Sequence, residues 1–249
     1  MSTSAMRLAR ALSLAVVLAT VPAPAFAAPP AQNGNPNPGI IPPNAHYAGL
    51  TYDEWLAALN QWILAVPAAD NANLVGNEDK IAVGQPRHVW FLSNIAQPVV
   101  DRHFIIPAGT ALYASIFGVA ADNFLCGPDT NYTVKQLRDI AASIVDSFTN
   151  IEVEVDGVPV NDVAAYRSTS PVFASTLPDN NVLQYVGCDD ALPGTYGPMV
   201  ADGYGLLLAP LSVGEHTIHI AGVVIVDPSD PSKDVNVDVR WRITVASHK

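Results

Sequence analysis

The chain has 249 residues, a formal net charge of −11 and about twice as many acidic residues (23) as lysines and arginines (12). An acidic chain that is poor in lysine does not bind nucleic acid or anionic lipid through electrostatic attraction. The same acidity also serves solubility alone, so it identifies no partner.

The first 27 residues have the pattern of a secretory signal peptide. Arg7 and Arg10 precede the apolar run 11–21, and Ala25-Phe26-Ala27 is a small-x-small cleavage site. An uncleaved membrane anchor is disfavoured because the run is shorter than the roughly 20 residues that a spanning helix needs. We expect cleavage near Ala27 and a secreted or periplasmic protein without a transmembrane anchor. Cleavage removes two arginines and no acid, which takes the formal charge from −11 to −13.

Two cysteines, Cys126 and Cys188, remain in the expected mature chain. In an oxidising compartment a lone pair of cysteines most simply forms one disulfide. Such a disulfide would close a loop of about 60 residues and stabilise the fold by on the order of 4 kcal/mol in the chain-entropy model. The alternative is a pair of free or metal-bound thiols.

Residues 28–50 are rich in Pro, Asn and Gly and predict a flexible or extended leader ahead of one domain at 51–249. Two helices are expected, at about 51–65 and 133–148. Each begins with a capping box, Thr51 with Glu54 and Thr133 with Gln136, followed by apolar residues at helical spacing.

Three short apolar segments, 88–93, 102–106 and 111–119, are separated by turn residues and predict an antiparallel meander. The segment 151–155 alternates, and the Asp156-Gly157 pair that follows is typical of a two-residue type I′ hairpin. Residues 178–202 predict a long irregular connection, which in compact domains tends to be functional or to cover an opening.

The C-terminal third gives the clearest strand signal. Residues 203–226 predict two strands joined by a tight turn, with Leu206, Leu207 and Leu208 buried on both faces. From Val235 to Val245 every odd residue is apolar and every even one polar, which indicates a strand with one face on a core. The fold class expected is therefore mainly β: an antiparallel β-sandwich, Ig-like or jelly-roll-like, with two peripheral helices.

Several sequence blocks occur in this order and span nearly the whole expected mature chain: TYDEWLAALNQWILAVP, HVWFL, IIPAGTALY, VDGVPV, AYRSTSPVF and ADGYGLLLAPLSVGEHTIHIAG. Together they resemble a widespread family of uncharacterised secreted bacterial proteins. The resemblance implies a secreted, single-domain β-sandwich with helical insertions, and it carries over no catalytic residue. An aromatic often stands in that family where this chain has Gly205, which implies that a surface or pocket aromatic is missing here.

The sequence offers few residues for chemistry. His88, His103 and His216 lie on or beside expected strands and could converge on a metal, but partly buried, hydrogen-bonded histidines explain them better. Arg167 is a candidate pocket arginine, for which structural pairing with an acid is the simpler explanation. The sequence contains neither Gly-x-Ser-x-Gly nor a Gly-rich phosphate loop, which argues against a serine hydrolase of that type and against nucleotide use. No metal and no cofactor is expected.

Two functional hypotheses follow. The first is a secreted β-sandwich module, binding or structural and not catalytic, with a glycan or a protein as its ligand. The alternative is a secreted hydrolase or metal-dependent enzyme that acts on an extracellular polymer, with its site near His88, His103 or Arg167.

Overall fold

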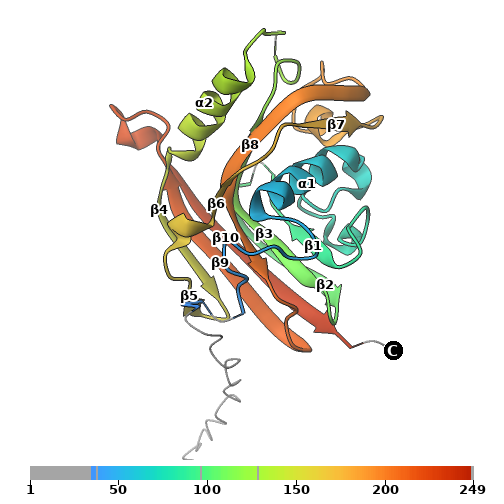
Figure 1. Cartoon of the computed structure of the whole chain (residues 1–249), viewed down its shortest axis with the longest axis vertical. Coiled ribbons are helices and arrows are strands. Elements are labelled where there is room, and N and C mark those ends of the chain that lie inside the picture. The colour runs from blue at the N-terminus through green and yellow to red at the C-terminus, as the bar shows by residue number, and fades with distance from the viewer. Residues whose placement is uncertain (1–34, 38, 96, 128, 248–249) are drawn as a thin grey trace, which may run out of the picture.

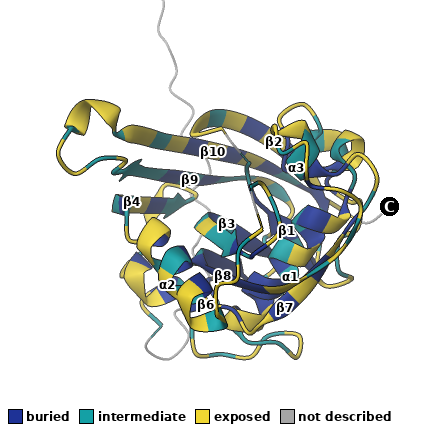
Figure 2. Ribbon diagram, turned by 90° about the horizontal axis from the view of Figure 1, so that it is seen from above, coloured by how far each residue is buried: buried dark blue, intermediate teal, exposed yellow. Residues whose placement is uncertain are grey.

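The computed structural model describes residues 35–37, 39–95, 97–127 and 129–247. The expected signal peptide at 1–27 and the first part of the expected leader lie outside these residues. Two five-stranded sheets pack face to face, and the longer helices cover the outer side of one of them (Figure 1, Figure 2). The mainly β sandwich with peripheral helices that the sequence predicts is thus confirmed.

The first sheet carries the helices. Its strands are β1 (Val89–Leu92), β3 (Ala111–Ala121), β8 (Gly194–Leu208) and β6 (Arg167–Thr169), with β7 (Phe173–Leu177) also paired to β8. Leu206, Leu207 and Leu208 are at most 1% exposed, as the apolar run predicts for a strand covered on both faces. β8 has 15 residues, so at about 3.3 Å per residue it extends from one end of the sandwich to the other.

The second sheet leaves its outer face open to solvent. Its order is β2 (Val99–Pro107), β10 (Val235–Ala246), β9 (Gly214–Val224), β4 (Phe148–Val155) and β5 (Val158–Pro159). The expected pairing of the last two long strands is confirmed, with Trp241 opposite Ile218 and both turned into the core. Asp156 and Gly157 both have positive φ, as the expected type I′ turn requires.

Two helices pack on the first sheet, α1 (Tyr52–Ala65) and α2 (Val134–Val145), and both expected capping boxes are present. α2 is shorter than expected because Phe148 is the first residue of β4, where its ring packs 4.6 Å from that of Phe117. The remaining helical elements are α3 (Val182–Tyr185) and the 3₁₀ turns η1 (Ala68–Asp70), η2 (Glu78–Lys80), η3 (Val163–Tyr166) and η4 (Pro231–Lys233).

The predicted antiparallel meander is wrong. β1 pairs in parallel with β3, and β2 crosses to the other sheet, where it pairs in parallel with β10. The inward residues of β2 account for this pairing, because Phe104 and Ile106 are buried opposite the core residues Ile243 and Val245 of β10. A short turn can join two strands of one hairpin or carry the chain from one sheet to the other. The length of the turns therefore does not determine which strands pair.

The two strands expected in 203–226 are present, and the turn at 209–213 that joins them crosses from one sheet to the other. One further boundary differs from the expectation. The irregular connection expected at 178–202 is shorter, because β8 already begins at Gly194, where it pairs with β7.

The described part of the leader is attached to the domain. Ile40 is 5% exposed and bridges to Leu208 of β8. Asn37 is buried, and its Nδ2 donates to the Tyr166 hydroxyl (3.0 Å). The folded unit therefore includes residues well before Thr51.

Candidate functional site

The histidines named from the sequence do not converge. His88 is exposed just before β1, and His103 is exposed on the outer face of β2, where its Nε2 lies 2.7 Å from the hydroxyl of Thr244. His216 lies at the start of β9. Across residues 35–247, where described, no three His, Cys, Asp or Glu side chains are grouped closely enough to hold a metal ion.

Arg167 holds α2 against the first sheet. Its Nε donates to Asp202 (2.8 Å) and its Nη1 to Asp146 at the end of α2 (2.6 Å). These hydrogen bonds, that of Asp202 first, raise the pKa of the guanidinium against the opposing effect of burial. The guanidinium also lies over the ring of Tyr204. The side chain stays 29% exposed, and its hydrogen bonds are made with the protein itself.

His216 forms a serine–histidine–aspartate contact that sequence spacing did not reveal. Its Nδ1 lies 2.7 Å from Asp156 Oδ2, and its Nε2 lies 3.2 Å from the hydroxyl of Ser212. However, Nε2 is closer to the backbone carbonyl of Ser212, at 2.9 Å. Because a carbonyl oxygen only accepts hydrogen bonds, Nε2 carries a hydrogen in this contact, whereas a general base for a serine needs a nitrogen without one. The contact therefore fastens the β4–β5 turn to the β8–β9 turn.

Arg102, which the sequence reasoning passed over, is the most deeply buried charge described. Its side chain is 0% exposed, its Nε donates to Glu78 (2.7 Å), and its Nη2 donates to the carbonyls of Ala72 and Leu74 (2.7 and 2.8 Å). Burial lowers the pKa of Arg102, and the hydrogen bond to Glu78 opposes that effect. The alternation of buried and exposed residues in β2 was the available signal for this burial, since Arg102 shares the inward face of the strand with Phe104. It anchors a loop and faces no ligand space.

A shallow cleft of about 510 Å³ lies between the start of α1 and α2. It is lined by polar and charged side chains and one proline: Thr51, Asp53, Glu54, Arg138, Thr169, Ser170 and Pro171. Ligand pockets are generally concave and mostly apolar. This cleft is open and polar, so it lacks the enclosure that a small-molecule site uses.

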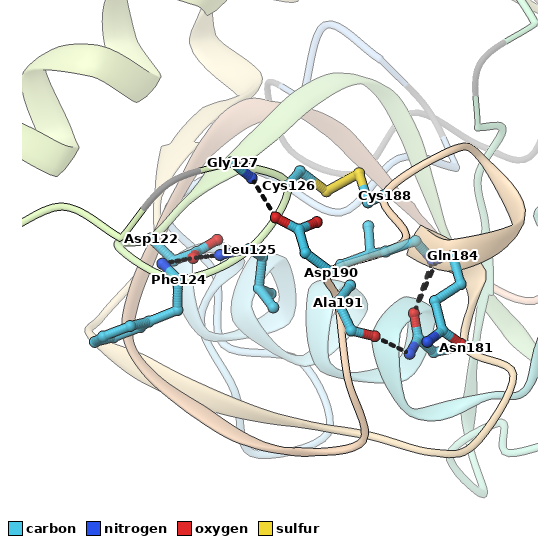
Figure 3. Close-up of a disulfide and its surroundings, with 11 residues drawn as sticks. Asp122, Phe124, Leu125, Cys126, Gly127, Asn181, Gln184, Cys188, Asp190 and Ala191 are labelled. Atoms are coloured by element: carbon cyan, nitrogen blue, oxygen red, sulfur yellow. Dashed lines mark hydrogen bonds between the residues drawn. A yellow bond between two sulfur atoms is a disulfide. The ribbon is translucent and has the colours of Figure 1, made fainter.

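The end of the sandwich where β8 begins is built differently. There the Cys126–Cys188 disulfide joins the β3–α2 loop to the segment after α3, which confirms the pairing predicted from the sequence (Figure 3). The Asp190 carboxylate accepts from the amide of Gly127 (3.1 Å), and Asp122 Oδ1 accepts from the amides of Phe124 and Leu125 (both 2.7 Å). The two loops are thus fixed to each other by covalent and polar contacts.

These segments carry large apolar side chains. We define the loop-end surface by five residues: Phe124, Tyr185, Val186 and Leu192, which are exposed, and Tyr196 near the start of β8, which is half-buried. Tyr185 is 68% exposed and Leu192 59%. The rings of Phe124 and Tyr196 lie 6.5 Å apart, and the Tyr196 hydroxyl donates to the carbonyl of Leu192 (2.9 Å). In Figure 3 Phe124 points away from the disulfide while Leu125 points inward.

The loop-end surface lies in an acidic part of the chain. The sequence has no lysine or arginine between Arg102 and Lys135, and none between Arg167 and Lys233. The segments that build the surface carry exposed aspartates, among them Asp129 and Asp189. The predicted disulfide already connected the irregular segment 178–202 with the loop after β3. No signal in the sequence predicted which apolar side chains these two segments expose.

Comparisons with known proteins yield little. No family model and no curated protein matches the chain. Among solved structures, a cysteine protease inhibitor from Entamoeba histolytica is similar over 64% of this chain and 95% of its own, with 10% identity and a TM-score of 0.21. Within the described residues, none of the helices has the length and apolar character needed to span a membrane.

Proposed function

We propose that this protein is exported through its N-terminal signal peptide and works outside the cytoplasm as a non-catalytic binding module. The observation that carries the proposal is the loop-end surface, where large apolar side chains are exposed on two loops that a disulfide fastens together. Exposed apolar patches on soluble proteins mark interaction sites. A disulfide also suits an oxidising compartment, and the resemblance to secreted bacterial proteins supports the same location.

The rest of the molecule supports binding rather than catalysis. The core between the sheets is filled with buried apolar side chains, and the two arginines described above are engaged in structural contacts. Arg102 and Arg167 each bind carboxylates and backbone carbonyls of the protein. A rigid, pre-formed loop surface binds a ligand with little ordering cost.

The test compares ligand spectra of matched variants. The mature chain, immobilised through its C-terminus, is exposed to glycan and peptide arrays beside the double variant Tyr185→Ser/Leu192→Ser. The control is Val158→Ser in β5 at the opposite end, whose residue is 63% exposed, close to the 59% of Leu192. We expect ligands of the wild type to be lost by the double variant and kept by the control. Equal spectra for all three proteins would contradict the proposal.

A secreted hydrolase is the second candidate, and the contact of His216 with Asp156 and Ser212 is the observation that favours it. The carbonyl of Ser212 at 2.9 Å from Nε2 argues against it. The discriminating measurement is turnover of an activated acyl ester by wild type, Ser212→Ala and Asp156→Asn. We expect the three rates to be equal. A wild-type rate that both substitutions abolish would establish the hydrolase instead.

A further inference from the structure

The loop-end surface also indicates what kind of partner it fits. We propose that it binds a cationic segment of a polypeptide, in which arginine or lysine residues alternate with apolar ones. This inference rests on the proposed function and deepens it.

Four of the five side chains of the loop-end surface are exposed, and the backbone that carries them is fixed. Tyr185 and Leu192 each leave more than half of their surface in water, and Phe124 is 37% exposed. Interface hot spots are enriched in tyrosine and other aromatics that fill pockets on a partner. The backbone beneath them is held by the disulfide and by Asn181, whose Nδ2 donates to the carbonyl of Ala191 (2.8 Å) and whose Oδ1 accepts from the amide of Gln184 (3.2 Å) (Figure 3).

The acidic side chains around the loop-end surface favour a positively charged partner. Asp129 and Asp189 are exposed, and in the described part of the chain neither carboxylate has a side-chain ion pair or a hydrogen bond. The segments 103–134 and 168–232 contain no lysine or arginine, so the charged side chains that they bring to the surface are acidic. Complementary charge across an interface steers association and excludes like-charged partners. A partner that brings arginine or lysine therefore satisfies these carboxylates.

The same charges disfavour other occupants. A second copy would bring aspartates against aspartates, and like charges that face each other are destabilising. Nucleic acids and anionic membranes are repelled for the same reason. A glycan prefers a flat aromatic platform, but the rings of Phe124 and Tyr196 are inclined by 42° and do not share a plane. Val186 and Leu192 are aliphatic, so of the residues of this surface that are more than 40% exposed only Tyr185 offers a sugar a ring to stack on.

The experiment uses three fluorescently labelled peptides of equal length as probes. One alternates Arg and Leu, one alternates Glu and Leu, and one alternates Arg and Ser. Fluorescence anisotropy at physiological salt measures their binding to the mature chain and to four variants. Two variants alter the surface, Tyr185→Ser/Leu192→Ser and Asp129→Asn/Asp189→Asn. Two are matched controls at the other end or on the open sheet face, Val158→Ser and Glu152→Gln.

We expect the Arg–Leu peptide to bind most tightly. The Tyr185→Ser/Leu192→Ser variant should weaken it by about tenfold or more, as for interface hot spots. The Asp129→Asn/Asp189→Asn variant should weaken it by about two- to fivefold, as for exposed charge pairs. Val158→Ser and Glu152→Gln should bind as the wild type does. Thermal unfolding of each variant verifies that it is folded.

Several results would overturn the inference. The first is failure of the Arg–Leu peptide to bind, and the second is equal affinity for the Glu–Leu peptide. A third is binding of the Arg–Ser peptide as tight as that of Arg–Leu, because simple charge attraction then suffices. Sedimentation that shows a dimer abolished by Tyr185→Ser/Leu192→Ser, or a glycan ligand lost in the same variant, would also overturn it. A dimer or a glycan ligand at this surface would still agree with the proposed function. The proposed function itself is contradicted if substitutions at the loop-end surface leave the array spectra unchanged.

Discussion

The hydroxyl oxygen of Tyr113 in β3 lies 2.5 Å from the position that a Cβ of residue 205 in β8 would occupy. Gly205 is buried, and Tyr113 is 0% exposed. The glycine therefore makes room for the tyrosine ring across the β3–β8 ladder. The resemblance implied a missing surface or pocket aromatic at this position, but the structure shows a core position whose space the ring of Tyr113 already fills.

We expect Gly205→Ala to lower the free energy of unfolding by about 1–3 kcal/mol, as overpacking of a core does. The added methyl group meets the Oη, Cζ and Cε1 atoms of Tyr113, all within 3.0 Å. Shortening the opposing side chain should relieve the clash, so Gly205→Ala/Tyr113→Leu should cost less than the sum of its two single substitutions. Urea unfolding of the four proteins measures this coupling. Strict additivity would show that the two residues do not compete for space.

Tyr113→Phe should leave the free energy of unfolding unchanged or raise it. The Tyr113 hydroxyl is buried, and within the described residues it has no hydrogen-bond partner. Burial also raises the pKa of this hydroxyl, so it stays neutral at any ordinary pH. An unsatisfied buried polar group destabilises the folded state, and its removal without a change of shape lifts that cost. The comparison is Tyr52→Phe, which removes a hydroxyl bound to the carbonyl of Ile41 and should lower stability.

The parts of the fold that could be predicted are those that local rules determine. The alternation from Val235 to Val245 and the two capping boxes each depend on neighbouring residues only, and each is confirmed. The choice of sheet for β2 and β9 depends on which distant strand completes the core, and short turns do not encode it. For this reason the meander was wrong although its strands were correctly placed.

The candidate site also combines features that the sequence predicts locally with features that only the tertiary fold determines. The disulfide could be predicted because two cysteines leave one pairing, and the irregular segment 178–202, which carries four of the five residues of the loop-end surface, was also predicted. Phe124 and Tyr185 are 61 positions apart in the sequence, and no period or motif relates them. Their exposure on neighbouring loops is a consequence of the tertiary fold.

Arg102→Met should lower the free energy of unfolding by about 3–5 kcal/mol, as the loss of one partner of a buried ion pair does. The substitution keeps an apolar stem but leaves Glu78 without its cation and the carbonyls of Ala72 and Leu74 without a donor. The matched control is Arg242→Met on the same sheet. Arg242 pairs with Asp101 with both side chains about half exposed, and such pairs contribute about 0–1 kcal/mol. Equal losses in urea unfolding would contradict a structural role specific to Arg102.

Glu78 should make stability dependent on pH in the acidic range. Burial raises the pKa of its carboxyl, but hydrogen bonds from Arg102 and from the amide of Gly76 outweigh burial, so the pKa lies below its ordinary value of 4.5. The unfolded chain therefore takes up the proton at a higher pH than the folded protein does. The stabilisation is fully present above about pH 4.5 and is lost as the pH falls through the lowered pKa.

The measurement is urea unfolding of wild type and Glu78→Gln from pH 7 down to pH 3. The wild type should be the more stable protein at neutral pH, and the difference should shrink as the pH falls, because the variant lacks the titrating group. Glu152→Gln, which alters an exposed carboxyl on the open sheet face, serves as the control for general acid effects. A difference that stays constant over the whole range would mean that Glu78 does not titrate differently in the folded protein.

Replacing both cysteines by serine should lower the free energy of unfolding by about 4 kcal/mol, because the bond closes a loop between positions 62 residues apart and restricts the unfolded chain. Removal of the disulfide should change the structure only near the two loops that it joins. Hydrogen exchange should accelerate at the amides of Gly127 and Cys188, whereas the β9–β10 ladder, at Trp241 for example, should keep its protection. If the loop-end surface depends on this fixation, the same variant should bind the Arg–Leu peptide more weakly while the sandwich remains folded. Unchanged exchange at Gly127 together with unchanged affinity would show that the polar contacts of Asp122, Asp190 and Asn181 hold the two loops without the disulfide.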